Sequence, residues 1–247
     1  MIESLPLAAT RISTMLGDQP LTSATGFFFE RGADLYVVTS RHVVLDEPSE
    51  HRPDRIEIEL HVNPENLGDT VQFSIPLYRD GKSVWRDGLD SAGAIDVVAL
   101  RLERAALPEK LLCRAFTPDQ LLRRLDLVEM GAAVLIVGFP LGVYDTLHRL
   151  PVARQAVIAS SFGIRFQGKG CFLTDARLHR GTSGAPVVAR KTRRGSGGDG
   201  RKDFPWMLLG VHSAKLDVAN RDSSQDESLD LNFAWYADIL LTLTRPA

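Results

Sequence analysis

Short β-rich segments separated by turn residues run through most of this chain, and they constrain its fold more than any other feature. In Arg55–Val62, apolar and charged residues alternate, which is typical of a half-buried strand. Leu35–Thr39 is rich in β-branched and aromatic residues and follows a turn at residues 31–34. Many short strands with few helices indicate a β-barrel or a β-sandwich. The other expected strands are Ala9–Leu16, Ala24–Glu30, Val71–Leu77, Val97–Leu102, Val134–Val137, Gln155–Ser160, Gly170–Thr174, Ala185–Ala189, Met207–His212 and Asn232–Ala234.

Helical periodicity occurs in two segments, and one of them divides the chain. Pro118–Leu127 follows Thr117, a candidate N-cap, and Tyr236–Leu243 lies near the end of the sequence. Because the first segment falls near the middle, we expect it to connect two β units. The expected single domain of residues 1–247 then has an N-terminal barrel at about 9–116, a connector at 117–130, a C-terminal barrel at 131–235 and a C-terminal helix and tail at 236–247.

Length and composition are those of an ordinary globular protein. The chain has 247 residues, of which 44% are hydrophobic and 24% charged, so it carries enough apolar material for a sizeable core. This length suits one large all-β domain or two small ones. The net charge is −2 and the isoelectric point about 6.3. We therefore expect no nucleic-acid partner and interpret the scattered arginines as solvated surface.

The sequence contains no recognisable targeting or membrane segment. Its first seven residues, Met-Ile-Glu-Ser-Leu-Pro-Leu, lack the basic stretch and long apolar run of a secretory signal. No segment approaches the roughly 20 apolar residues of a membrane-spanning helix. We therefore expect a cytoplasmic protein with no membrane partner.

Two cysteines, Cys113 and Cys171, are too few for a disulfide-stabilised scaffold and lack the spacing of metal ligands. We interpret both as buried small apolar residues, with a single bridge as the alternative, and expect no metal site. Two polar segments, Arg190–Asp203 and Asp217–Asp230, are expected to be mobile. The first is interpreted as a long exposed hairpin loop, with a basic docking site as the alternative.

The turn Gly181–Pro186 reads Gly-Thr-Ser-Gly-Ala-Pro and places a serine between glycines. A serine nucleophile needs a tight turn whose backbone N–H groups point at the spot where an oxyanion will form. Gly181 would let the preceding peptide turn its N–H inward, and Gly184 would leave room for substrate. The alternative is an ordinary turn of small residues and proline. Ser183 is therefore the candidate nucleophile.

A histidine and an aspartate upstream of this turn stand where a catalytic base and its partner are expected. His42 follows the β-rich run at 35–39, and its imidazole has the near-neutral pKa that suits a general base. Asp96 directly precedes an apolar strand, where a buried carboxylate could orient an imidazole. The alternatives are a surface histidine and a turn aspartate. Asp90 competes with Asp96, but it lies in a loop with no strand directly behind it.

The three candidates follow one another in the order His, Asp, Ser. This order differs from the subtilisin and α/β-hydrolase arrangements and is that of the chymotrypsin arrangement. His42 and Asp96 fall in the first half of the chain and Ser183 in the second. That distribution suits an enzyme whose site lies in the cleft between two barrels.

Several motifs together resemble the bacterial trypsin-like serine peptidase domain of the chymotrypsin clan, and the pattern is closest to the HtrA-type proteases. Leu173–Ala176, followed after five residues by Thr182–Pro186, is similar to the TDA and NSGGP motifs of that family, and the two motifs align without a gap between them. The matches extend from about residue 24 to residue 245. The remaining ones are Gly138–Gly142 with a G-x-P-x-G loop, Gly26–Phe29 with a Gly-rich first hairpin, and Leu231–Ala234 with the last strand.

The resemblance implies an all-β, chymotrypsin-like double β-barrel and a serine endopeptidase that works through a Ser-His-Asp triad and an acyl-enzyme. It implies protein or peptide substrates and no organic cofactor. By this resemblance, the backbone N–H groups of Gly181 and Ser183 form the oxyanion hole. Ser213 would hydrogen-bond Asp96 and fix its carboxylate, and a plain strand serine is the alternative.

The sequence departs from the family pattern in ways that bear on control. Thr182 stands where members activated by N-terminal cleavage keep an aspartate, and the chain has no Ile-Val-Gly-Gly start, no PDZ domain and no secretory signal. We therefore expect a protease regulated by loop ordering or by a regulatory protein partner, with Gly138–Leu150 and Asp217–Asp230 as the candidate switches. The alternative is a catalytically latent or inactive binding module on a protease-like fold.

The segment Gly210–Ala214 resembles the strand that pairs with the substrate backbone and forms a wall of the specificity pocket. The candidate substrate-binding residues there are Val211, His212, Ser213 and Ala214, together with Leu178 five positions before Ser183. The histidine at position 212 resembles the one that proteases cutting after Glu or Gln carry at this point. Those proteases usually also keep a hydroxyl residue at the position of Leu178. Arg177 stands where trypsin-like members keep an acidic residue, so we do not expect cleavage after Lys or Arg. An apolar residue before the scissile bond is ranked first and Glu or Gln second.

Overall fold

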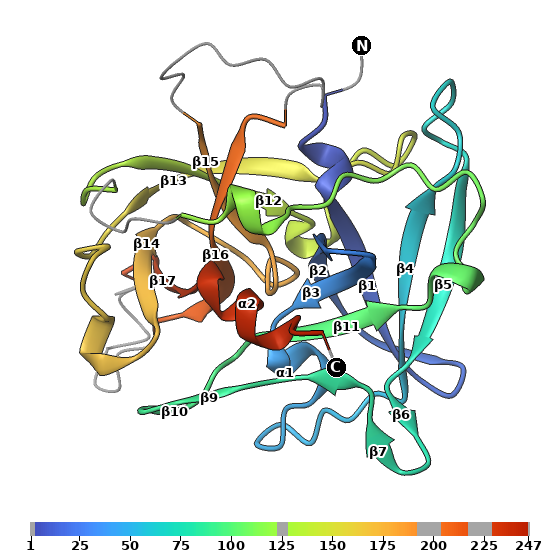
Figure 1. The fold of residues 1–247 in the computed structure, drawn as a ribbon, viewed down its shortest axis with the longest axis horizontal. Coiled ribbons are helices and arrows are strands. Elements are labelled where there is room, and N and C mark those ends of the chain that lie inside the picture. The colour runs from blue at the N-terminus through green and yellow to red at the C-terminus, as the bar shows by residue number, and fades with distance from the viewer. Residues whose placement is uncertain (1–2, 123–127, 192–203, 217–228, 247) are drawn as a thin grey trace, which may run out of the picture.

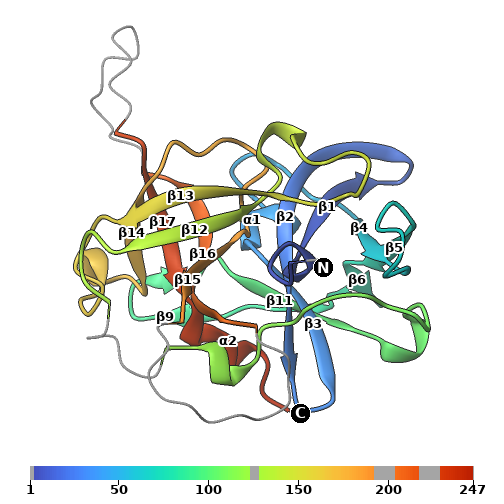
Figure 2. The same cartoon turned by 90° about the horizontal axis from the view of Figure 1, so that it is seen from above.

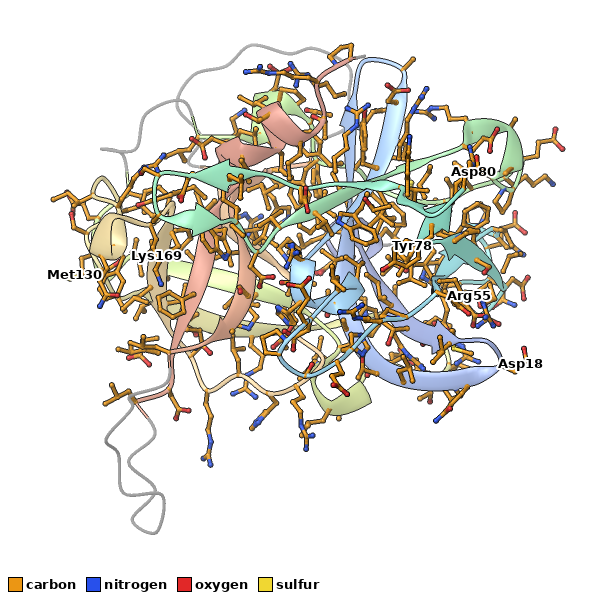
Figure 3. The ribbon with its side chains drawn as sticks, turned by 90° about the horizontal axis from the view of Figure 1, so that it is seen from below. Asp18, Arg55, Tyr78, Asp80, Met130 and Lys169 are labelled. Atoms are coloured by element: carbon orange, nitrogen blue, oxygen red, sulfur yellow. The ribbon has the colours of Figure 1, made fainter. Side chains whose placement is uncertain are left out.

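Two β units lie side by side in the computed structural model of the chain, which describes residues 3–122, 128–191, 204–216 and 229–246 (Figure 1). Figure 2 shows the same separation from above. Asp18, Arg55, Tyr78 and Asp80 mark the side of the first unit in Figure 3, and Met130 and Lys169 mark the side of the second.

Seven antiparallel strands form the main sheet of the N-terminal unit, in the order β5-β4-β1-β2-β3-β11-β8. Alternation along β4 turns Ile56, Ile58 and Leu60 inward, and each is at most 1% exposed. Two short hairpins, β6-β7 and β9-β10, flank the sheet. The strands are β1 (Ala9–Leu16), β2 (Gln19–Arg31), β3 (Asp34–Thr39), β4 (Arg55–His61), β5 (Thr70–Pro76), β6 (Tyr78–Arg79), β7 (Lys82–Ser83), β8 (Trp85–Arg86), β9 (Leu89–Asp90), β10 (Gly93–Ala94) and β11 (Val98–Leu102).

Six antiparallel strands close into a barrel in the C-terminal unit, in the order β12-β13-β14-β17-β16-β15. Its interior is filled by a separate apolar cluster that includes Phe172, Val187 and Ala234. Together with the first unit, this barrel confirms the all-β, chymotrypsin-like double β-barrel expected from the sequence. The strands are β12 (Ala133–Gly138), β13 (Val152–Ile158), β14 (Cys171–Asp175), β15 (Pro186–Arg190), β16 (Trp206–Lys215) and β17 (Leu231–Tyr236).

A further apolar cluster joins the two units. It contains Phe27 and Val38 from the N-terminal sheet and Val188 and Val211 from the C-terminal barrel. The C-terminal helix packs into the same cluster through Leu240. This helix consists of a 3-10 turn, η8 (Ala237–Ile239), followed by α2 (Leu240–Leu243). The expected helix at this end is thus present, and it begins after Tyr236 because that residue is the last of β17.

The expected helix over Pro118–Leu127 is wrong at Leu121. The structure has only a 3-10 turn, η3 (Pro118–Gln120), in which Thr117 and Gln120 form a capping box. Leu121 is extended, with ψ 146°, and forms a parallel bridge with Leu208 of β16. Tertiary pairing with the C-terminal barrel therefore overrides the local helical pattern. Residues 123–127 lie outside the described part of the chain.

Short helices elsewhere mark the ends of strands. One of them, α1 (Arg41–Val44), was not expected from the sequence, because a single turn carries no periodicity. None of the helices in the described residues is long and apolar enough to cross a membrane. The remaining 3-10 turns are η1 (Pro6–Ala8), η2 (Arg104–Ala106), η5 (Pro140–Gly142) and η6 (Phe166–Gly168).

Both cysteines are free thiols. Cys171 is buried and Cys113 is half-buried, so the alternative of a bridge between them is not realised. Burial raises the pKa of each thiol to about 11, which keeps both protonated near neutral pH. Most of the two polar segments, Arg190–Asp203 and Asp217–Asp230, lies outside the described residues.

Candidate active site

The register of β3 and β11 brings His42 and Asp96 together. Thr39, the last residue of β3, pairs with Val98, the first of β11. His42 lies just past the end of β3, and Asp96 lies just before the start of β11, so both stand at the same edge of the sheet. There, His42 Nδ1 lies 2.7 Å from Asp96 Oδ2, and the His42 backbone N–H donates to Asp96 Oδ1 at 2.8 Å.

Ser213 completes the hydrogen bonding of Asp96 from the other β unit. Its hydroxyl donates to Asp96 Oδ2 at 2.5 Å. Burial by itself would raise the pKa of Asp96, but its interactions with His42 and Ser213 outweigh burial and lower that pKa. Burial would likewise lower the pKa of His42, but the hydrogen bond and the charge of Asp96 outweigh it and raise that pKa above 6.5. The pair is therefore an ionised carboxylate that favours a protonated imidazole.

The turn that carries Ser183 requires glycine on both sides. Gly181 has φ +94° and Gly184 has φ +83°, a region that favours glycine. A Cβ at Gly184 would lie 2.2 Å from the Thr25 carbonyl oxygen and the Thr39 hydroxyl. The sequence-based interpretation of Gly184 as room for substrate is corrected here, because that space holds the backbone and side chains of the N-terminal unit.

Three threonine and serine side chains from the N-terminal unit hold this turn and the adjacent strand. Thr25 Oγ1 donates to the Gly181 carbonyl at 2.7 Å and accepts from the Phe139 N–H at 3.1 Å. Thr39 Oγ1 donates to the Thr25 carbonyl at 2.8 Å, and Ser40 Oγ donates to the His212 carbonyl at 3.1 Å. In addition, the Thr25 N–H donates to the Ser183 carbonyl at 3.0 Å. The short polar run at residues 39–40 was a signal for such a role, but its partners lie too far along the chain to be read from the sequence.

Thr182 turns its side chain back into its own loop. It is 2% exposed, and its hydroxyl donates to the His179 carbonyl at 2.6 Å. The Ala185 N–H then donates to the Thr182 carbonyl at 2.9 Å. The loop before Ser183 is thus closed by its own residues.

Ser183 and His42, the predicted nucleophile and base, are both among the described residues and are not hydrogen-bonded to each other. Within those residues, no acceptor receives the backbone N–H of Gly181 or of Ser183. Free N–H groups are what an oxyanion hole requires before substrate binds. Catalytic hydrogen bonds are often long in the absence of substrate, so the arrangement is compatible with an enzyme at rest.

Besides Ser213, the predicted substrate-binding residues lie in different surroundings. Val211 is buried in the cluster that joins the two units, and Leu178, at 1% exposure, packs inside the C-terminal barrel. Ala214 is exposed. His212 is 3% exposed, and its backbone pairs with the turn beyond Ser183, donating to the Ala185 carbonyl and accepting from the Gly184 N–H, both at 2.8 Å.

A cavity of about 580 Å³ opens beside the loop that leads to Ser183. It lies between η5 with Val143, the start of β13, and His179. The Leu141 N–H donates to the Arg180 carbonyl at 2.6 Å, which joins the cavity wall to the loop that carries Ser183. Among the described residues, no group of three or more His, Cys, Asp or Glu side chains is arranged to hold a metal ion.

Comparisons with known proteins agree with this architecture. The family model of the trypsin-like peptidase domain matches residues 24–194. No curated protein matches the chain in sequence.

Solved structures of proteases are similar in fold. A serine-to-alanine variant of the HtrA-type protease AlgW with a tripeptide is 16% identical with a TM-score of 0.56, and a serine endoprotease from Yersinia pestis is 15% identical with a TM-score of 0.54. The match covers 96% of this chain in both cases, but only 58% and 61% of those chains, so this chain spans about three fifths of their length. An inactivated protease paralogue from the scabies mite is 17% identical with a TM-score of 0.55, over 96% of this chain and 92% of its own.

Proposed function

Because this chain belongs to the trypsin-like peptidase domain family, we propose that it is a serine endopeptidase acting on protein or peptide substrates. The observation that carries the proposal is the pairing of His42 Nδ1 with Asp96 at 2.7 Å, at the edge of the N-terminal sheet. Ser213 and the Ser183 turn reach the same edge from the C-terminal barrel. Family membership supports the reaction class, and these contacts support the choice of residues.

In the proposed reaction, the Nδ1–H of His42 donates to Asp96, so Nε2 is left as the proton acceptor. Nε2 takes the Ser183 Oγ proton while Oγ attacks the carbonyl carbon of the scissile peptide bond. The same proton then passes to the leaving amine as the C–N bond breaks, which leaves an acyl ester on Ser183. Water hydrolyses this ester by the reverse proton path, and Ser183 is regenerated.

The oxyanion of each tetrahedral intermediate is assigned to the N–H groups of Gly181 and Ser183. Each such donor stabilises the transition state by about 2.7–4 kcal/mol. The positive φ of Gly181 and the hydrogen bond from Thr25 to the Gly181 carbonyl support this assignment, because together they fix the orientation of the turn.

The test is cleavage of an unfolded protein substrate by the wild type and by Ser183→Ala. We expect the wild type to cleave and Ser183→Ala to lose all measurable cleavage while its melting temperature stays unchanged. Ser23→Ala, at an exposed serine of β2, is the matched control and should retain full activity. A fluorophosphonate probe should label the wild type and Ser23→Ala but not Ser183→Ala. Cleavage by Ser183→Ala would overturn the assignment of the nucleophile.

Control by loop ordering or by a protein partner belongs to the same proposal. The Thr182 side chain, which hydrogen-bonds the His179 carbonyl within its own loop, supports control that acts through the loops around Ser183. Low activity of the pure protein that rises on adding cell extract would support this. A cytoplasmic location remains a prediction from the sequence.

A catalytically inactive binding module is the second candidate function. One structural neighbour is an inactivated protease paralogue, so the fold also occurs without activity. Probe labelling separates the two functions, because a binding module would leave Ser183 unlabelled under every condition.

A further inference from the structure

Three polar side chains inside the C-terminal barrel have atoms with no hydrogen-bond partner among the residues that the structure describes. The atoms are His212 Nδ1, Asn232 Oδ1 and Thr174 Oγ1. Their residues are 3%, 0% and 0% exposed. Leaving a buried polar atom unpaired costs about 1–3 kcal/mol of folding free energy. A cluster of three such atoms therefore needs an explanation.

Strand register places these three side chains on one face. Thr174 of β14 pairs with Asn232 of β17, and His212 of β16 pairs with Ala234 of β17. Asn232 and Ala234 are two residues apart, so they point to the same side of β17. That side is the barrel interior, because Ala234 belongs to its apolar core. Thr174 lies directly opposite Asn232, and His212 lies diagonal to Asn232, beside the register shift that follows His212, so Asn232 is within reach of both side chains.

The same three residues lie next to the nucleophile turn. The backbone of His212 is hydrogen-bonded to Gly184 and Ala185, the two residues after Ser183. Asn232 Nδ2 donates to the Ala176 carbonyl at 2.7 Å, at the start of the segment that leads to Ser183. Ser183 would attack the carbonyl of the substrate residue immediately before the scissile bond. The side chain of that residue would then lie closest to this cluster.

The chemistry of the unpaired atoms selects among side chains. Burial, with a smaller contribution from the charge of His42, lowers the pKa of His212 to about 3, so its ring is neutral at working pH. A neutral imidazole has one donor and one acceptor, Asn232 Oδ1 is an acceptor, and the Thr174 hydroxyl can be either. A carboxamide brings donors and an acceptor and can pair with all three. A carboxylate has no donor for Asn232 and would bury a charge beside a neutral ring, and an apolar side chain pairs with none.

We propose that His212, Asn232 and Thr174 form the polar floor of a subsite that selects glutamine immediately before the scissile bond. The proposal rests on the proposed peptidase function. It reverses the ranking from the sequence, which placed an apolar residue first because Leu178 lacks a hydroxyl. In the structure, the Thr174 hydroxyl and the Asn232 carboxamide oxygen, from β14 and β17, supply the polar atoms that Leu178 lacks.

The test uses one quenched fluorescent peptide made with Gln, Glu, Asn, Leu or Lys before the scissile bond. We expect kcat/KM for the Gln peptide to exceed that for the Leu peptide by at least tenfold, with Glu below Gln. Thr174→Val keeps the side-chain shape and removes the hydroxyl, and it should reduce this ratio severalfold. The matched control Thr10→Val changes a buried threonine of the N-terminal unit and should leave the ratio unchanged. His212→Leu should shift the preference to Leu.

A preference for Leu in the wild type, or a ratio that Thr174→Val and His212→Leu leave unchanged, would overturn the subsite. A preference for Glu over Gln would overturn the carboxamide assignment.

A binding measurement keeps this inference separate from the proposed function. In Ser183→Ala, a peptide that ends in Gln should raise the melting temperature more than one that ends in Leu, and Thr174→Val should remove the difference. If this difference is seen but the wild type neither cleaves nor takes the fluorophosphonate probe, the peptidase function fails and the subsite stands. If the wild type cleaves and is labelled but the difference is absent, the subsite fails and the peptidase function stands.

Discussion

Two polar clusters meet on neighbouring residues of β16, and they differ in how well their hydrogen bonds are satisfied. Ser213 donates into the cluster of His42 and Asp96, where the carboxylate receives three hydrogen bonds. His212, one residue earlier, belongs to the cluster with Asn232 and Thr174, where each side chain has an unpaired atom. A satisfied cluster fixes the orientation of its members, whereas an unsatisfied one gains by binding a ligand. The first cluster therefore suits positioning, and the second fits the proposed recognition of a substrate side chain.

The largest effect is expected from Asp96→Asn, which breaks the satisfied cluster. An amide in place of the carboxylate would hold His42 in the wrong tautomer, so kcat should fall by about 10⁴-fold. Steady-state kinetics on a peptide substrate measures this. Asp90→Asn is the control, since Asp90 was the competing aspartate in the sequence and instead pairs with Arg165 and the Gly170 N–H. A loss from Asp90→Asn as large as that from Asp96→Asn would contradict the role of Asp96.

The pH dependence of activity should show the effect of Asp96 on His42. Because the carboxylate raises the pKa of His42, kcat/KM should increase about tenfold per pH unit on the acid side and level off above pH 6.5.

A raised imidazole pKa also stabilises the fold. That contribution is fully present below the unfolded-state pKa of His42 and is lost as pH rises through the folded-state value. The stability advantage of the wild type over His42→Gln should therefore shrink as pH rises, and an acid limb centred below pH 6.5 would refute both expectations.

A smaller effect is expected from Ser213→Ala. Removing its hydroxyl deprives Asp96 of one of its hydrogen bonds, so the lowered pKa of the carboxyl should move back toward its usual value. Hydrogen bonds to charged groups contribute about 1.5–3 kcal/mol, so urea unfolding near pH 7 should reveal a loss of that order. Because a lowered carboxyl pKa stabilises the fold only while the group is ionised, the loss should diminish as pH falls through the folded-state pKa of Asp96. A loss that stays constant down to acid pH would argue that Ser213 acts through packing alone.

The smallest effect, and one of opposite sign, is expected from Thr174→Val. This change removes a buried hydroxyl that has no partner, so the free energy of unfolding should stay the same or rise by up to about 1 kcal/mol. Measured beside Ser213→Ala in the same urea series, it tests the contrast between the clusters directly. Destabilisation by more than about 1 kcal/mol would mean that the Thr174 hydroxyl is satisfied in the free protein.

The sequence was a good guide where strands carry a pattern longer than a few residues. β1 has the expected bounds, and the alternating segment at 55–62 is β4, because one buried face dictates such alternation. The hairpins β6-β7 and β9-β10 were missed because two-residue strands have no periodicity. The prediction of a helix at 118–127 failed at Leu121 because this residue forms a bridge with Leu208, a tertiary contact that no local sequence pattern contains.

For the candidate site, motif order and local setting pointed to His42, Asp96 and Ser183, and strand register explains why the first two meet. The support from Thr25 and the unpaired atom of Asn232 could not be predicted. Thr25 reaches Gly181 across 156 residues of sequence, and the shortage of partners at Asn232 depends on what the closed barrel places around it.

The threonine contacts across the two units have a consequence for how the protein could be divided. The turn that carries Ser183 belongs to one barrel by sequence but is held in shape by Thr25 of the other, and Thr39 in turn hydrogen-bonds the Thr25 carbonyl. Fragments separated near the connector would each retain a core of their own, yet only their reunion would restore the shape of that turn. Reactivity at Ser183 would then report the association of the two halves, as in a split reporter.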